Sequence, residues 1–193
     1  MTDRLTAQME FLTEACRLKS VTRGTRLCDG SRHENSGEHS WHIALYALTL
    51  AEHAPDGVTI ARVIQMLLLH DLVEIDAGDA PIFGDHDAEE MAAREDAAAS
   101  RIFGLLPPDQ ATAFRALWDE FEAAETADAR FAKSLDRFQP PNQNLASGGG
   151  SWVDYDTTWD LFETRVGRKI ATGAPTLWAW LKPRATAWFK TNR

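Results

Sequence analysis

The chain has 193 residues, a mass of 21.5 kDa and a formal net charge of −9 at pH 7. Its 44% hydrophobic and 25% charged residues form an ordinary globular composition, which excludes a disordered or fibrous protein. The acidic balance argues against a nucleic-acid polymer as partner, because a phosphate backbone requires a basic surface. No linker-like stretch divides the chain, so we expect one domain over 1–193.

Cysteine usage and hydropathy predict the compartment. Cys16 and Cys28 are the two cysteines, too few for a disulfide framework and consistent with a reducing environment. The first ten residues carry acids where a signal peptide needs an apolar run. The longest apolar stretch, residues 63–69, is too short to span a bilayer. We therefore expect a soluble cytoplasmic protein with no membrane partner.

Apolar residues recur at helical spacing along most of the chain, as Leu5, Met9 and Leu12 illustrate. No sustained alternation of apolar and polar residues predicts a sheet. The predicted fold class is all-α, a bundle of about eight helices. In chain order these helices are expected over residues 5–16, 36–53, 59–77, 87–103, 107–121 and 126–139, then over 159–170 and from 175 onward.

Turn and capping residues predict where these helices begin and end. Ser36, Thr59 and Thr126 are the expected N-caps, and Asp87 is expected to form a capping box with Glu90.

Two further features concern the helix interiors. Pro140 and Pro141 are expected to stop the sixth helix, and a long glycine-rich loop is expected over 142–156. The helix over 36–53 has a second apolar stripe at Trp41, Leu45 and Leu48, so we expect it to be buried on both sides.

Four polar side chains fall on helical faces that are otherwise apolar: His39, His70, Asp71 and Asp136. A buried unpaired carboxylate is costly, and a buried imidazole needs partners for both ring nitrogens. One such histidine is usually satisfied by core hydrogen bonds. Four of them share one explanation, a divalent metal with mixed nitrogen and oxygen ligands. We therefore expect one divalent cation bound by these four residues.

Glu74 lies one helical turn after His70, so the two side chains share a helix face. Taken alone, an acid near a helix C-terminus is a surface residue. Beside a metal, a carboxylate that is not a ligand is suited to accept a proton from water. We expect Glu74 to be catalytic.

Three segments together resemble a known family: residues 32–40, 69–74 and 132–137, which contain an H…HD…D pattern. The set resembles the HD-domain metal-dependent phosphohydrolases, and within them the 5′-deoxynucleotidase branch that includes bacterial YfbR and HD domain-containing protein 2. The resemblance covers about 18–138, and we expect the helices over 157–191 to pack on that part.

The resemblance implies an all-α HD domain with one metal ion held by His39, His70, Asp71 and Asp136. It implies removal of the 5′-phosphate from deoxyribonucleoside monophosphates, supported by cobalt or manganese, with iron, zinc and magnesium as other candidates. A homodimer is implied as well.

The resemblance also assigns roles by position. Glu74 matches the catalytic acid, Asp79 a second acid near the sugar and the attacking water, and Arg23 a phosphate-binding arginine. Gly24 stands where the bacterial enzymes carry a tryptophan that helps exclude ribose, so the choice between deoxyribose and ribose stays open.

The charges suggest how such a site would work. A phosphate monoester carries nearly two negative charges and repels an approaching hydroxide. A divalent cation acidifies water and neutralises a phosphate oxygen, and the planar fork of Arg23 adds a cation that keeps its proton. Arg32 is a further candidate for the phosphate, although a loop arginine is more often solvated. Glu74 accepts the proton of water or relays one to the leaving oxygen.

Three other functions remain open at this stage. A related phosphohydrolase could act on a nucleoside triphosphate, a cyclic nucleotide or a non-nucleotide phosphate. A regulatory module could bind a nucleotide without turnover. A metal-dependent oxygenase would require extra histidines that the motif positions do not supply.

The C-terminal helices predict the oligomeric state. Trp178, Trp180, Leu181, Trp188 and Phe189 offer more apolar surface than a final helix pair usually hides. We expect a homodimer.

Overall fold

The computed structural model describes residues 3–192 and is almost entirely helical. Its α-helices, in chain order, are α1 (Arg4–Ala15), α2 (Ser36–Thr49), α3 (Ile60–Leu69), α4 (Glu74–Ala77), α5 (Ala88–Phe103), α6 (Pro108–Ala123), α7 (Ala127–Ala146), α8 (Ser151–Asp154), α9 (Trp159–Phe162), α10 (Arg168–Gly173) and α11 (Pro175–Asn192). Helices α4, α8 and α9 are single turns of four residues. The longer helices of the described residues form the predicted all-α bundle.

A small sheet was not expected from the sequence. Strand β1 (Thr22–Arg26) pairs antiparallel with β2 (His33–Asn35), with Thr22 opposite Asn35. The strands are three to five residues long, too short for alternation to be recognised in the sequence. The hairpin matters because it carries Arg23 and leads directly into α2.

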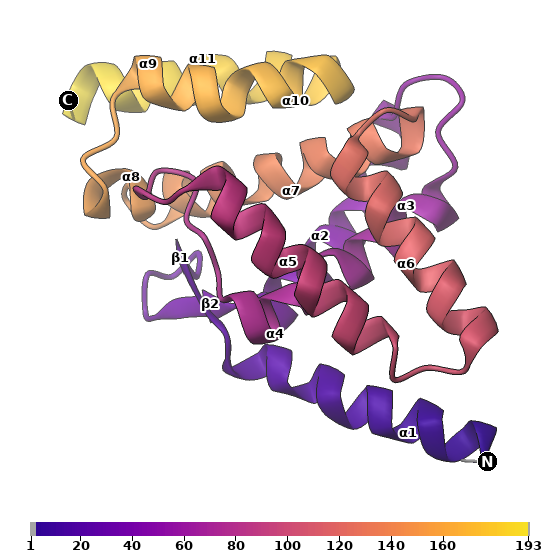
Figure 1. The fold of residues 1–193 in the computed structure, drawn as a ribbon. Helices are drawn as coiled ribbons and strands as arrows, with labels where there is room; N and C mark the ends of the chain where they lie inside the picture. Colours follow the sequence, from indigo (N-terminus) through magenta and orange to yellow (C-terminus); the bar gives the residue numbers. More distant parts are fainter. Residues whose placement is uncertain (1–2, 193) are drawn as a thin grey trace.

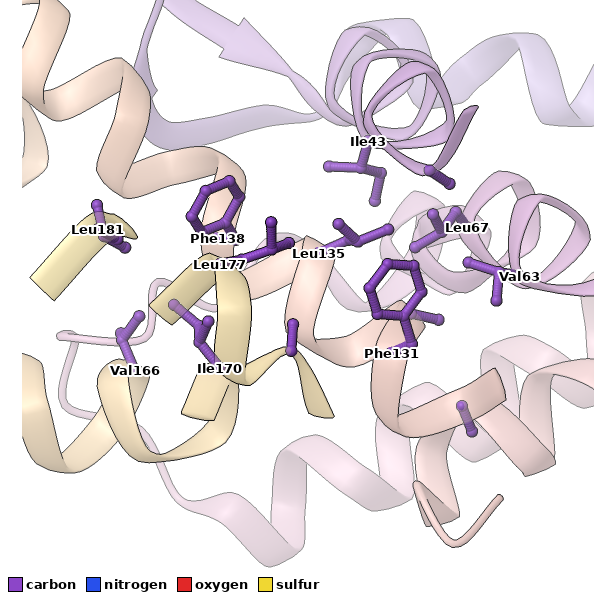
Figure 2. Close-up of a cluster of buried hydrophobic side chains, with 14 of the residues drawn as sticks. Ile43, Val63, Leu67, Phe131, Leu135, Phe138, Val166, Ile170, Leu177 and Leu181 are labelled. Carbon is purple, nitrogen blue, oxygen red and sulfur yellow. The ribbon is translucent and has the colours of Figure 1, made fainter. Parts of the chain in front are cut away.

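Helix α7 runs through the middle of the molecule (Figure 1) and packs against α2, α3, α6, α10 and α11. Apolar side chains from all of these helices meet in one core around α7 (Figure 2). Leu135 and Phe131 of α7 are fully buried there, facing Leu67 of α3 on one side and Ile170 of α10 on the other. The C-terminal helices are therefore part of the same core as α2 and α3.

A second apolar cluster lies between α1, α5 and α6, where Phe11, Ile102, Phe103 and Trp118 are buried. It fixes the helices that flank the His70 turn, since the Trp118 indole donates to the His70 carbonyl at 3.2 Å. None of the described helices is long and apolar enough to cross a membrane.

The expectation that two prolines end the sixth helix is wrong. Helix α7 continues through Pro140 and Pro141 to Ala146. Each proline removes one backbone donor, which leaves the carbonyls of Asp136 and Arg137 without their usual i−4 bonds, and the side-chain amide of Asn142 donates to the next carbonyl, that of Phe138. Tertiary burial of this last part of α7 outweighs the local preference for a break.

The predicted long loop is correspondingly short. Residues 147–150 connect α7 to α8, with Gly148, Gly149 and Gly150 at φ of 77°, 123° and 45°. A side chain on Gly149 would overlap Trp188 of α11, so the turn depends on glycine for both conformation and space.

Three details of the helix ends differ from the sequence expectations. Asn35, not Ser36, caps α2, and it forms a reciprocal capping box with Glu38. Asp87 accepts from the backbone of Glu90 without a reciprocal bond. Thr59 begins α3 without a side-chain cap bond.

The apolar stripe on α2 is also exposed, contrary to expectation. Trp41 is 63% exposed, Leu48 60% and Leu45 42%. The opposite stripe, with Ile43 and Ala47, is the face that enters the core. Helix α2 is thus buried on one side and presents large apolar side chains on the other.

Candidate metal centre

Three elements bring the predicted metal ligands together. Helix α2 supplies His39, the turn after α3 supplies His70, and α7 supplies Asp136. All three are buried, and one donor atom from each lies within 4.8 Å of the others. The Nε2 atom of His39 is 3.1 Å from Oδ1 of Asp136, and Nε2 of His70 is 3.9 Å from the same oxygen. Residues far apart in the sequence therefore present nitrogen and oxygen donors to one point.

Asp71 lies beside this group. Helix α3 ends at Leu69, and residues 70–73 form a tighter 3₁₀ turn. Asp71 Oδ1 is 2.8 Å from Nε2 of His70, while Oδ2 accepts a hydrogen bond from Arg23 at 2.7 Å. Asp71 is not in the set of three whose donor atoms are all mutually close. Its role as the fourth ligand stays a prediction.

The hydrogen bond that His70 makes on its outer side leaves the Nε2 atom of its ring facing the centre. The Nδ1 atom of His70 lies 2.9 Å from the Leu67 carbonyl, which can only accept, so Nδ1 carries the proton. Its Nε2 is buried and has no hydrogen-bond partner among the described residues. A buried nitrogen lone pair beside carboxylates is the arrangement that a cation satisfies, and outer partners of this kind orient metal-binding histidines.

His39 is held in the same way by residues on its other side. Its Nδ1 lies 3.1 Å from Oε1 of Gln139 and 3.5 Å from Oε1 of Glu34. Burial and Arg23 oppose protonation of His39, but the hydrogen bonds with Asp136 and Glu34 outweigh them and raise its pKa to about 9. Without a bound cation, His39 is therefore protonated at neutral pH.

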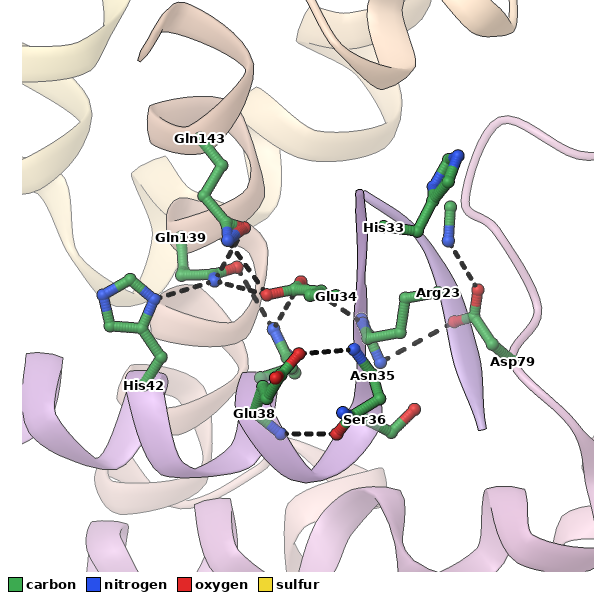
Figure 3. Close-up of polar contacts among 12 residues, drawn as sticks. Arg23, His33, Glu34, Asn35, Ser36, Glu38, His42, Asp79, Gln139 and Gln143 are labelled. Atoms are coloured by element: carbon green, nitrogen blue, oxygen red, sulfur yellow. Dashed lines mark hydrogen bonds and ion pairs between the residues drawn. The ribbon is translucent and has the colours of Figure 1, made fainter. Parts of the chain in front are cut away.

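Glu34 is a functional residue that sequence reasoning missed. It lies on β2, is 1% exposed, and accepts hydrogen bonds at Oε2 from the amides of Gln139 (3.1 Å) and Gln143 (3.0 Å), as Figure 3 shows. Gln139 also contacts His42 at 3.1 Å, so His42 belongs to this outer network and not to the ligand set. Gln139 lies at the end of the predicted sixth helix, and Gln143 lies in the last part of α7, which was predicted to be loop.

Arg23 occupies the centre of the acidic cluster. From β1 its guanidinium approaches Asp71 at 2.7 Å, Glu74 at 3.4 Å and Asp79 at 3.6 Å. It also lies 3.7 Å from Glu34 (Figure 3). Although burial lowers its pKa, these carboxylates outweigh that effect and raise it. The predicted phosphate-binding arginine thus already neutralises protein carboxylates.

Glu74 is buried at the start of α4, so the interpretation as a surface acid does not apply. The Ser36 hydroxyl donates to its Oε2. Burial, followed by the negative charge of Asp71, raises the pKa of Glu74 well above its ordinary value. A carboxyl group with a raised pKa is suited to proton transfer.

The remaining two candidates differ in position. Asp79 lies at the same centre, where its Oδ2 accepts from the backbone N–H of Gly24 at 3.2 Å and where burial raises its pKa. Arg32 is not brought to the centre. It is exposed and forms a double ion pair with Glu38, with Nη1 2.8 Å from Oε2.

The centre opens into a hollow of about 230 Å³ lined by His70, Asp71, Glu74, Asp79 and Asp136. We call it the inner hollow. It holds carboxyl groups of contrasting character, because the pKa of Asp136 is lowered by Arg137 and His39 despite burial, whereas that of Glu74 is raised. Carboxyl groups with lowered and raised pKa values beside two imidazoles can hold a cation and move a proton in one space.

Comparison with known proteins supports this interpretation. The HD domain family model matches residues 15–178. The chain is 31% identical to the human 5′-deoxynucleotidase HDDC2 over 130 residues, which are 67% of this chain and 62% of that protein. It is 30% identical to the 5′-deoxynucleotidase Ent638_2835 of Enterobacter sp. strain 638, over 62% of this chain and 63% of that one. The chain thus spans less than two thirds of the length of these curated relatives.

A solved structure is more similar. The structure titled as a predicted metal-dependent phosphohydrolase from Magnetospirillum magnetotacticum MS-1 is 47% identical, with a TM-score of 0.90 over 97% of this chain and 96% of that chain. The family match covers most of the sequence and includes every element that carries a predicted metal ligand. The chain therefore belongs to the HD domain family.

Proposed function

We propose that this protein is a metal-dependent phosphohydrolase that removes the 5′-phosphate from deoxyribonucleoside or ribonucleoside monophosphates. The observation that carries the proposal is the buried group of His39, His70 and Asp136, whose donor atoms meet within 4.8 Å beside Glu74, a carboxyl group with a raised pKa. The relatives named 5′-deoxynucleotidase support the substrate class.

The donor set fits a divalent cation held by His39, His70 and Asp136, with Asp71 as the proposed fourth ligand. Two imidazoles and carboxylate oxygens suit cobalt, manganese, iron or zinc better than magnesium, which prefers oxygen ligands alone. When bound, such a cation supplies a Lewis acid that polarises a phosphate oxygen and acidifies water.

The residues around the inner hollow have proposed roles in proton transfer and orientation. Glu74, held by the Ser36 hydroxyl, exchanges a proton with the attacking water or with the leaving 5′-oxygen. Asp79 is anchored by the Gly24 backbone beside the sugar, where it orients that water. Arg23 neutralises the ionised carboxylates, so that a phosphate dianion can approach.

The exposed apolar residues of α2 support a homodimer as the partner. Trp41, Leu45 and Leu48 form a surface that a second copy of the chain would cover. Trp180 of α11, 47% exposed, extends it, because Leu45 and Trp180 line one hollow of about 430 Å³. Of the other apolar residues predicted for the interface, Leu181 and Phe189 are buried in the core.

The activity is tested by measuring inorganic phosphate released from a panel of substrates. With manganese or cobalt, we expect release from deoxyribonucleoside and ribonucleoside monophosphates and none after chelation. The panel includes nucleoside triphosphates, a cyclic nucleotide and a non-nucleotide monoester. Faster phosphate release from one of these compounds would replace the proposed substrate class. If no substrate released phosphate, the protein would be a binding module.

The separate roles of ligand and proton-transfer residue are tested by two variants. Glu74→Gln should retain the metal, because Glu74 is not a ligand, and lose at least about 100-fold in turnover. Asp136→Ala should lose the metal, measured by elemental analysis. Asp76→Asn, at a surface carboxylate bound to Arg101, is the matched control and should keep both properties. Full metal occupancy in Asp136→Ala would contradict the ligand assignment.

Metal affinity should rise with pH. His39 has a pKa of about 9 in the metal-free protein, and Nε2 must lose its proton before it can bind a cation. The apparent affinity for manganese should therefore fall about tenfold for each pH unit below that value. Titration calorimetry measures this affinity and the accompanying proton release. The control variant His42→Gln should show the same dependence of manganese affinity on pH. If the manganese affinity of the wild-type protein did not change between about pH 7 and about pH 8.5, the role of His39 protonation would be refuted.

The dimer is tested by sedimentation velocity at micromolar concentration. The wild-type protein should sediment as a dimer, and Trp41→Glu with Leu45→Glu should yield a monomer, because charges would have to be buried at the interface. Leu12→Glu, at an exposed leucine of α1, introduces a charge on a different surface and should leave the dimer intact. A monomeric wild-type protein would exclude the proposed partner.

A further inference from the structure

Arg137 follows the proposed metal ligand Asp136 on α7 and borders three hollows of the protein. One is the inner hollow. A second, which we call the outer hollow, has a volume of about 520 Å³ and is lined also by Lys169 and Arg165. The third lies under β1 and is lined by Gly24 and Tyr155. A ligand that reaches the metal ligands from either neighbouring hollow meets the Arg137 side chain.

The guanidinium of Arg137 is poorly satisfied by the protein. Its Nε is buried without a hydrogen-bond partner, although the side chain as a whole is 26% exposed. Among the described residues its one ion pair is with Asp136, at 3.6 Å, which is too long for a hydrogen bond. A guanidinium has five donors in a planar fork, and no hydrogen bond to a described residue uses those of Arg137.

Lys169 of α10 adds a second cation without a carboxylate partner. No described residue places a carboxylate oxygen within 4.0 Å of its Nζ, whereas the neighbouring Lys133 is paired with Glu122 at 2.8 Å. Burial, with the charges of Arg137 and Lys133, lowers the pKa of Lys169. Two cations that repel each other beside an acidic protein surface indicate that an anion completes the group.

The two arginines singled out by the sequence have closer carboxylate partners. Arg23 has a buried Nε without a hydrogen-bond partner as well, but its Nη1 lies 2.7 Å from Asp71 and within 3.6 Å of Glu74 and Asp79. Arg32 is bound to Glu38 at the surface.

We propose that Arg137 and Lys169 bind the phosphate group of the substrate at the edge of the inner hollow. The inference rests on the proposed function for the identity of the anion, a phosphate monoester dianion. The guanidinium fork matches two phosphate oxygens, and Lys169 adds a point charge from the outer hollow. Arg137 thereby becomes a substrate-binding residue that the motif comparison did not assign.

Binding of inorganic phosphate tests the proposal independently of turnover. Isothermal titration calorimetry is carried out on the manganese-loaded and the metal-free protein. Arg137→Gln should weaken phosphate binding at least about tenfold in both forms, because it removes a bidentate, charged donor. The phosphate affinity of Arg137→Lys should fall between those of Arg137→Gln and the wild type. Arg130→Gln, seven residues earlier on α7 and bonded to the Glu125 carbonyl, removes the same charge outside the hollows and should bind like the wild type.

Lys169→Gln is a second variant at an exposed position, which keeps the test decisive if Arg137→Gln does not fold. It should weaken phosphate binding several-fold, while its neighbour Arg168→Gln should not. In kinetic assays, Lys169→Gln should raise KM for the nucleotide more than it lowers kcat. Phosphate affinity within twofold of the wild type in Arg137→Gln, or in Lys169→Gln where the first is unfolded, would overturn the proposal.

These outcomes separate the binding site from the activity. Phosphate binding that depends on Arg137, in a protein that hydrolyses no nucleotide, would leave the site standing and refute the proposed function. Nucleotide hydrolysis by the wild-type protein, with unchanged phosphate affinity and KM in the variants, would support the proposed function and refute the phosphate site.

Discussion

The folded chain has to bury more negative charge at one point than its own cations neutralise. Five carboxyl groups lie within or beside the inner hollow, all of them largely removed from water: Glu34, Asp71, Glu74, Asp79 and Asp136. Each loses hydration on folding, and only a nearby cation or hydrogen-bond donor offsets that loss. The cluster divides accordingly. Burial raises the pKa values of Glu74 and Asp79, whereas neighbouring cations lower the pKa values of Asp71 and Asp136 despite their burial. A divalent cation would relieve the excess where the imidazole lone pairs also meet.

This electrostatic constraint explains why the metal ligands could be predicted from the sequence. A polar residue on an apolar helix face violates the pattern that surrounds it, and His39, His70 and Asp136 all do so. The helices themselves followed from apolar spacing, because the core around α7 needs continuous apolar faces. Caps such as Thr126 and Asp87 were local enough to be recognised from a few residues.

Other features depended on contacts that no local pattern reports. Pro140 and Pro141 indicate a helix end, yet packing of the last part of α7 keeps the helix intact. That continuation places Gln143 on Glu34, next to Gln139, and Glu34 in turn contacts His39. The only sequence signal for Glu34 was its position in a segment matched to the family. The exposed stripe of α2 was misjudged because an apolar face predicts burial without distinguishing a core from an interface.

Arg23 and Arg137 differ in how far the carboxylates of the protein already neutralise their charge. Arg23 is placed by β1 among carboxylates, so its cost of burial is already met before any substrate arrives. Arg137 has fewer carboxylate partners, with a single ion pair of 3.6 Å, and its buried Nε lacks an acceptor, as does the Nε of Arg23. A phosphate gains more from a guanidinium that has no close carboxylate to release first. This difference in ion pairing is the reason for proposing Arg137 as a phosphate-binding residue in addition to the motif arginine Arg23.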